Sequence, residues 1–182
     1  LNVNKPGTGS GFVNSTNPPG VINCGGTCSA NLGSGTPVTL QAIANPGSTF
    51  TGWTGAGCSG TGSCSFTMDA AQTVNATYTL NKYNLATSVT GSGTLGNNPT
   101  GTSCGANCQT YDYATYVAVT ATPSAGWSFS SWTGPCDAII GNICYANMTS
   151  AKSVSASFSQ IMFALNVNKP GTGSGFVNST NP

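Results

Sequence analysis

Apolar and polar residues alternate along several short stretches of the chain. In the segment VTLQAIA, Val38, Leu40, Ala42 and Ala44 fall on one face, and the polar residues between them fall on the other. Strict alternation rich in valine, threonine and aromatic residues is typical of a half-buried antiparallel strand. The same period of two recurs in three further segments, TVNATYTL (73–80), YVAVTA (116–121) and SVSASF (153–158).

Turn-forming residues separate the alternating stretches. The motifs TGSG, NPG, SGTG and MDAA are all turn-like in composition, and the 25 glycines favour turns over helices. No segment carries a sustained apolar stripe with the period of a helix, so any helix is expected to be a single turn at most. The pattern predicts an all-β fold built from small antiparallel modules, β-sandwich or β-grasp-like, with five to seven short strands each.

The chain repeats itself on two scales. Residues 165–182 are identical to residues 1–18, and a weaker similarity recurs after about 80 residues, as when GWTGAGC (52–58) is matched by SWTGPC (131–136). The sequence therefore predicts module 1 at residues 1–82, module 2 at residues 83–164, and the start of a further copy of module 1 at residues 165–182. The connecting stretches TLNK and SQIMFA are too short and apolar for flexible linkers, so neighbouring modules are expected at a fixed angle.

Charge is almost absent from this chain. Only 4% of its residues are charged and its formal net charge is +1, which leaves no basic surface for nucleic acid or anionic lipid. No apolar run approaches the ~18 residues that a membrane-spanning helix needs, so neither nucleic acid nor membrane insertion is expected. The charged residues are Lys5, Lys82, Lys152, Lys169, Asp69, Asp112 and Asp137.

Eight cysteines form four pairs of near neighbours. Their number in so short a chain indicates disulfides formed outside a reducing cytosol. Zinc is the competing interpretation, but spacings of three, five and seven intervening residues fit zinc knuckles poorly. Pairing of Cys24 with Cys64 would close a longer loop, yet the spacing favours local pairs, because a turn tied at its own base tolerates the larger loop of module 2. The expected pairs are Cys24–Cys28, Cys58–Cys64, Cys104–Cys108 and Cys136–Cys144.

A specific string of motifs runs through module 1. It comprises GSG (9–11), NCGGTC (23–28), GWTG (52–55), CSGTGSC (58–64), MDAA (68–71) and VNATY (74–78). In this order the motifs resemble the divergent internalin B-type repeats found in tandem in bacterial secreted and surface proteins. Module 2 has Ser131 in place of the first glycine of GWTG and a larger last cysteine loop. The resemblance implies an extracellular β-rich spacer related to β-grasp modules, and it implies no catalytic residues.

The chemistry needed for catalysis is largely missing from the sequence. There is no histidine, which excludes Ser-His-Asp and Cys-His arrangements. Asp112 and Asp137 are the one carboxylate pair to consider for glycoside hydrolysis, and nothing in module 1 supports that role. Clustered carboxylates for calcium are absent from the sequence, and no glycine-rich motif opens a helix that would bind phosphate. We therefore expect no enzyme activity, no cofactor and no metal.

Aromatic residues are the candidates for binding. Trp53 and Trp132 occupy equivalent positions before Thr-Gly, which favours packing at the ends of the β core over stacking on sugar rings. The stretch YDYATY (111–116) has no aromatic counterpart in module 1 and is expected to be exposed. The residues expected at contacts between modules or chains are Leu1, Val3, Leu165, Val167, Tyr111, Tyr113 and Tyr116.

These features favour a structural role. The sequence predicts a non-catalytic segment of an extracellular bacterial filament or surface stalk, built from disulfide-stapled tandem β repeats. The alternative is a tandem adhesin or carbohydrate-binding module of a larger secreted protein. The expected partners are copies of itself arranged head to tail, through a covalent tandem repeat or through strand addition, with glycans as partners in the alternative reading.

Overall fold

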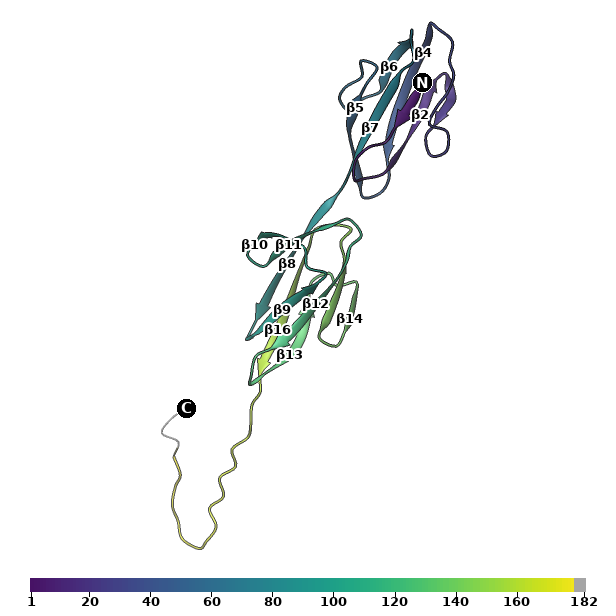
Figure 1. Ribbon diagram of the computed structural model, residues 1–182. Helices are drawn as coiled ribbons and strands as arrows, with labels where there is room; N and C mark the ends of the chain where they lie inside the picture. The colour runs from purple at the N-terminus through teal and green to yellow at the C-terminus, as the bar shows by residue number, and fades with distance from the viewer. Residues whose placement is uncertain (179–182) are drawn as a thin grey trace.

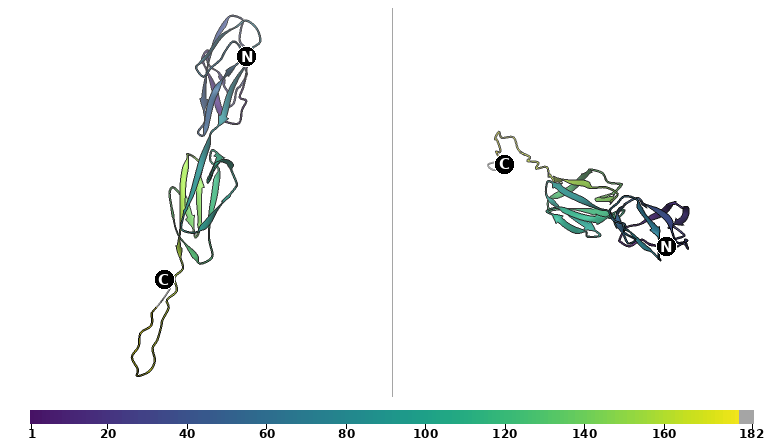
Figure 2. Two further views of the ribbon diagram at one scale, coloured as in Figure 1. Left: turned by 90° about the vertical axis from the view of Figure 1, so that its left-hand side faces the viewer. Right: turned by 90° about the horizontal axis from the view of Figure 1, so that it is seen from above.

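The computed structural model describes residues 1–178, and its strands fall into two groups that share no sheet. Module 1 lies upstream of Asn81 and module 2 lies downstream of it. Two perpendicular views show the modules following one another along a single direction, joined by a narrow connection (Figures 1 and 2). Residues 1–178 contain no helix, so the prediction of an all-β fold is confirmed.

Module 1 is a sandwich of two sheets. Its strands are β1 (Asn2–Asn4), β2 (Gly11–Asn17), β3 (Pro19–Asn23), β4 (Thr36–Ala44), β5 (Ser48–Thr54), β6 (Cys64–Met68) and β7 (Thr73–Leu80). One sheet has the order β1-β7-β5 and the other has the order β3-β2-β4-β6. Every pairing is antiparallel except that of β1 with β7, which is parallel.

The parallel pairing sets the direction in which the two modules follow one another. Because the first and last strands of the module run the same way, the chain begins the module at one end and leaves it at the opposite end. We call these the upstream end and the downstream end of the module. In module 2, β8 pairs with β16 in the same parallel manner, so the direction is kept from one module to the next.

Module 2 repeats this plan with two additional strands. Its strands are β8 (Lys82–Thr90), β9 (Gly93–Asn98), β10 (Thr102–Gly105), β11 (Cys108–Asp112), β12 (Tyr116–Pro123), β13 (Trp127–Thr133), β14 (Ala138–Ile140), β15 (Ile143–Asn147) and β16 (Lys152–Gln160). One sheet has the order β10-β11-β8-β16-β13 and the other has the order β14-β15-β12-β9.

The prediction of five to seven strands holds for module 1 and is wrong for module 2, which has nine among the described residues. The enlarged cysteine loop of module 2 accounts for one strand, because its extra residues fold back as β14 against β15. The segment after Cys108 accounts for the other, since it pairs with β8 over five residues. Its counterpart in module 1 also bonds to residues 1–3, but it forms an isolated bridge between Asn2 and Ser29 instead of a strand.

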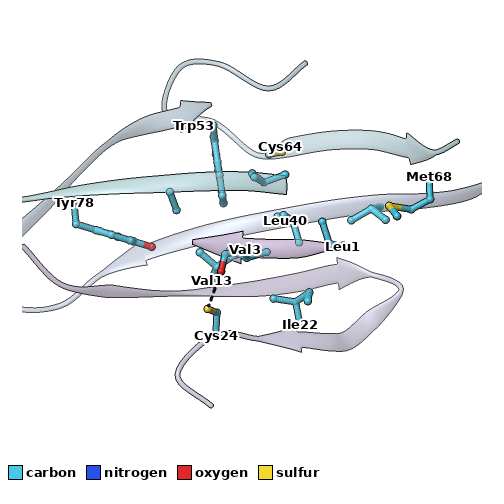
Figure 3. Close-up of a cluster of buried hydrophobic side chains, with 13 residues drawn as sticks. Leu1, Val3, Val13, Ile22, Cys24, Leu40, Trp53, Cys64, Met68 and Tyr78 are labelled. Atoms are coloured by element: carbon cyan, nitrogen blue, oxygen red, sulfur yellow. Dashed lines mark hydrogen bonds between the residues drawn. The ribbon is translucent and has the colours of Figure 1, made fainter. Parts of the chain in front are cut away.

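Each sandwich encloses its own hydrophobic core. In module 1, Val38 and Leu40 of β4 face Val74, Ala76 and Tyr78 of β7, and all five are buried. These are the positions that the alternating pattern assigns to the inner face. Figure 3 shows Leu1 and Met68 at one end of this core and Tyr78 at the other. Full burial of a valine or leucine side chain contributes about 1.5–3 kcal/mol, so this layer is the main source of the module's stability.

The repeated TGSG motif turns beneath the last strand of each module. Gly11 and Gly93, the final glycines of the two copies, lie against the rings of Tyr78 and Phe158, where a β-carbon would come within 2.2 and 2.5 Å of ring atoms. A side chain at either position would displace the aromatic ring from the core. The motif recurs because the aromatic residue of the closing strand recurs.

Residues 161–178 continue beyond β16 without regular strand structure (Figure 1). Leu165 is 87% exposed, whereas the identical position Leu1 is 9% exposed in the core of module 1. One local contact is shared by both copies, because Lys169 Nζ donates to the carbonyl of Gly175 just as Lys5 Nζ donates to that of Gly11. Residues 179–182 of the predicted third segment lie outside the described residues.

Candidate functional site: the joint between the modules

A single residue separates the two modules. β7 ends at Leu80 and β8 begins at Lys82, so Asn81 is the whole connection. Its amide donates a 2.8 Å hydrogen bond to the carbonyl of Gly47 in module 1, and its carbonyl accepts one of 2.8 Å from the amide of Tyr113 in module 2. Its side-chain oxygen also accepts a 2.7 Å bond from Thr49 Oγ1. Asn81 is therefore held from both sides.

The ring of Tyr113 lies directly on Gly47. A β-carbon at Gly47 would fall 2.0 Å from Tyr113 Cδ1, and the backbone there has φ +76°, a conformation that glycine adopts without strain. Tyr83, at the start of module 2, lies beside Tyr113 with ring centroids 6.5 Å apart. The turn between β4 and β5 thus fits beneath the ring of Tyr113, which has Tyr83 on another side.

An ion pair flanks the joint within module 2. Lys82 Nζ contacts Asp112 Oδ1, and the two residues lie opposite one another in the register of β8 and β11. Both side chains are largely exposed, at 63% and 51%. An exposed pair of this kind contributes little to stability, so the joint depends on backbone hydrogen bonds and aromatic contact.

The residues expected at contacts between modules or chains lie in different parts of the structure. Tyr113 lies at the joint, but Val3 and Tyr111 are buried in the cores of their own modules, and Leu1 lies at the rim of the module 1 core. Tyr116 is exposed on the surface. Leu165 and Val167 are exposed beyond module 2.

The expectation that YDYATY is exposed throughout is therefore wrong for Tyr111. This residue belongs to β11, which pairs with β8 at the centre of a sheet, and its side chain points into the core. The residues that complete the joint, Gly47 and Asn81, were not singled out from the sequence. The available signal was the shortness of the TLNK link and the position of NPG at a turn just before a strand.

The four disulfides join neighbouring cysteines. They are Cys24–Cys28, Cys58–Cys64, Cys104–Cys108 and Cys136–Cys144, and no described cysteine is free. In module 1 the first pair ties a turn beside β1, because the amide of Val3 donates to the carbonyl of Cys28. The Cys24–Cys28 loop is thereby fixed against β1.

The two equivalent tryptophans are buried rather than displayed. Trp53 is 2% exposed and Trp132 is 8% exposed, which supports their interpretation as core residues. Trp53 Nε1 donates a 2.6 Å hydrogen bond to the carbonyl of Gly62 in the CSGTGSC loop. Trp132 Nε1 meets no acceptor among the described residues, since the corresponding loop of module 2 folds into the hairpin of β14 and β15.

Two aspartates are engaged with lysines. Asp112 contacts Lys82, and Asp137 Oδ2 accepts a 2.6 Å hydrogen bond from Lys152 Nζ and another of 2.6 Å from the amide of Asn147. These bonds, with that of Lys152 the stronger, lower the pKa of Asp137 below its ordinary value. The carboxylate is therefore kept ionised, which suits an ion pair and opposes a role as a general acid.

Tyr78 and Tyr111 are buried in the cores of their modules. Burial raises the pKa of Tyr78 and of Tyr111 above the usual value for the phenol. Tyr78 Oη donates a 2.9 Å hydrogen bond to the carbonyl of Phe12, and Tyr111 Oη donates to Pro99. Both hydroxyl groups therefore satisfy backbone carbonyls at the edge of the core.

Residues 1–178 contain no group of three or more histidine, cysteine, aspartate or glutamate side chains placed to hold a metal ion. The same residues include no helical segment that could span a bilayer.

The fold and its joint define a tandem-repeat protein whose units are disulfide-fastened β-sandwiches linked head to tail. The chain belongs to the divergent InlB B-repeat domain family, whose profile matches twice, at residues 13–82 and 83–162. The recognised resemblance to internalin B-type repeats is thus confirmed. No curated protein and no solved structure is detectably similar to the chain. The disulfides and the family together indicate a location outside the cell or on its surface.

Proposed function

We propose that this chain is a structural, non-catalytic segment of an extracellular filament or surface stalk, in which sandwich modules follow one another head to tail. The observation that carries the proposal is the one-residue joint at Asn81, whose amide and carbonyl are bonded to different modules. Such a joint resists bending better than a glycine-rich linker, because its backbone groups already have fixed partners. A rigid joint is what a load-bearing stalk requires.

The downstream end of module 2 offers the same attachment. The amide of Ile161 donates a 2.8 Å hydrogen bond to the carbonyl of Gly126, just as the amide of Asn81 donates to that of Gly47. A contact between the downstream end of one unit and the upstream end of the next is heterologous, and such contacts propagate instead of closing. The geometry therefore supports an array that extends with each added unit.

The near absence of charge supports a structural role that is little affected by salt concentration. Only two side-chain ion pairs occur in the described residues, and neither joins the two modules. Packing that depends on apolar burial and backbone hydrogen bonds is little affected by salt. Four short disulfide loops add resistance to local opening.

A continuous chain accounts for the repeated terminal sequence better than strand addition to another molecule. The position that residues 165–168 would fill in a second copy is already held by that copy's own β1, paired with β7 and buried at Val3. Displacing an identical strand brings no net gain in contacts. The exposed copy is instead suited to beginning the next module of its own chain.

Chains carrying one, two and three joined copies of residues 1–164 test the proposal. Small-angle X-ray scattering should give a maximum dimension that rises by an equal increment with each copy. A rise closer to the square root of copy number, as expected for flexibly linked domains, would contradict a stiff stalk. A matched set with Gly-Ser-Gly-Ser inserted after Asn81 supplies the flexible reference.

A glycan array probed with the same chains tests the alternative role as an adhesin or carbohydrate-binding module. Tyr116, which is 58% exposed, is the most accessible tyrosine for stacking against a sugar ring. No saturable binding is expected. Binding that Tyr116→Ala abolishes would replace the structural proposal with a recognition function.

A further inference from the structure

The upstream end of module 1 carries an open depression that no side chain of module 1 fills. Its volume is about 300 Å³, and Leu1, Leu32 and Met68 form part of its wall together with Ala70 and Ala71. The rim is polar, with Asn31, Ser34 and Asp69. The depression lies where a preceding module would be joined, since Leu1 is the first residue of the module.

Module 2 fills the equivalent region with its own tyrosines. The amides of Gly35 and Ala114 donate to the carbonyls of Met68 and Met148, which places Ser34 and Tyr113 at equivalent positions and likewise Leu32 and Tyr111. Two tyrosines of module 2 therefore stand where module 1 has a leucine and a serine. Val3 pairs with Val74 and Thr87 pairs with the equivalent Val154, which places Leu1 and Leu85 at equivalent positions and Tyr83 two residues before the equivalent of Leu1.

The two connecting segments have the same length. Between the anchored residue Asn81 and Leu85 there are Lys82, Tyr83 and Asn84. Between the equivalent anchor Ile161 and Leu165, the residue identical to Leu1, there are Met162, Phe163 and Ala164. Phe163 therefore has the position of Tyr83, and Met162 has that of the charged Lys82.

The side chains of Met162 and Phe163 are largely exposed to solvent in residues 1–178. Met162 is 82% exposed and Phe163 is 89% exposed. Gly126 is equally bare, since a β-carbon there would meet nothing within 4 Å, whereas the equivalent Gly47 is covered by Tyr113. Adjacent exposed apolar residues of this size usually mark a contact surface.

We propose that Phe163, with Met162 beside it, occupies the depression at the upstream end of the module that begins at Leu165. The inference rests on the proposed tandem function and specifies how its second joint is built. Covalent geometry brings the two together, because Phe163 lies two Cα steps of about 3.8 Å from Leu165, whose copy Leu1 lines the depression. In module 2 the equivalent residue Tyr83 lies beside Tyr113, whose counterpart Ser34 forms part of the rim of this depression.

The array consequently alternates between two kinds of joint. At Asn81 the following module inserts an aromatic ring against the preceding turn, and at Phe163 the connection inserts its ring into the following module. The two joints differ in one residue of the following module, which is Tyr113 in module 2 and the equivalent Ser34 in module 1.

The test completes the third module by appending residues 19–82 of this sequence after Pro182. The extended chain then holds two identical copies of module 1, one with an open depression at its start and one preceded by Phe163. Methyl NMR of ¹³C-labelled methionine should give separate resonances for the two copies of Met68, because only the second lies beside an aromatic ring. Phe163→Ala should merge these resonances, and Ile161→Ala is the matched control that should leave them separate.

Chymotrypsin gives an independent readout on the same chains. Cleavage after Phe163 should be at least about tenfold slower in the extended chain than in the 182-residue chain, because a docked segment must open before it is cut. Coincident Met68 resonances together with unchanged cleavage would overturn the inference. Small-angle X-ray scattering distinguishes that result from failure of the proposed function. A rigid extended particle would agree with the stalk and contradict only the Phe163 contact, whereas a flexible particle would contradict both.

Discussion

The amide of Tyr113 donates a 2.8 Å hydrogen bond to the carbonyl oxygen of Asn81, and this bond ties module 2 to the strand by which the chain leaves module 1. The same tyrosine covers Gly47 with its ring, so one residue provides both a directional bond and a packing contact. Together they fix rotation as well as bending at the joint.

Gly47→Ala should loosen the joint without unfolding either module. The new β-carbon would lie 2.0 Å from the Tyr113 ring, which must then move away. Residual dipolar couplings should report a single alignment tensor for both modules in the parent chain and two different tensors in the variant. Gly20→Ala is the control, since Gly20 has a similar φ of +74° but no neighbour within 4 Å. Equal couplings in the parent chain and Gly47→Ala would rule out a role for this contact.

Trp53→Phe should cost more stability than Trp132→Phe, by about 1 kcal/mol. Both substitutions shrink a buried ring equally, but only Trp53 loses a hydrogen bond, from Nε1 to the carbonyl of Gly62. Native-state hydrogen exchange of β7 and β16 amides measures the two modules separately within one chain. Equal losses would show that the bond contributes nothing net.

The Cys104–Cys108 disulfide should be the first to yield to a mild reductant. Cys104 is exposed, whereas each of the other three pairs contains one buried cysteine, which is Cys24, Cys64 or Cys144. Attack requires a thiolate to reach a sulfur atom, so access sets the order. Alkylation followed by mass spectrometry at successive times gives the sequence of reduction. Earlier labelling of Cys24 would contradict an order set by exposure.

Asp137 should titrate below the ordinary aspartate range. Its pKa is lowered in the folded chain, so the stabilisation it gives is complete above the unfolded value and is lost as pH falls through the folded value. The effect on overall stability should be small, because the side chain is 38% exposed. Carbonyl ¹³C NMR of Asp137 measures the pKa directly.

Lys152→Met provides the control for that titration. Removal of the lysine should raise the pKa of Asp137, while the amide of Asn147 keeps part of the lowering. A pKa that does not change in Lys152→Met would mean that the ion pair does not form in solution.

Much of the fold follows from short-range pattern. Val117, Val119 and Ala121 alternate with polar neighbours in the sequence, and all three are buried on the inner face of β12. The closely spaced cysteines also restrict each other to local partners. Such features are readable because the period of a strand and the closure of a small loop depend on neighbouring residues only.

The joint was less accessible to sequence reasoning. In YDYATY, simple alternation places Tyr111 and Tyr113 on one face, yet Tyr111 is buried and Tyr113 contacts Gly47. The strand ends at Asp112, and Ala114 has φ +62°, so the chain turns between them and the period is broken. Where the freed tyrosine then lies depends on module 1, which the local pattern does not describe.

Two identical segments of the chain show directly that local sequence does not decide burial. Residues 1–14 and 165–178 have one sequence and the same short-range lysine contact, which the local chain alone determines. Yet Val13 is fully buried in β2 while the identical Val177 is 62% exposed. Val13 is buried because β4 pairs with its strand and the opposite sheet covers it, and no described strand does this for Val177. Sequence determined which residues are able to form these strands, and tertiary structure decided which copy forms them, because a strand is stabilised by partners distant along the chain.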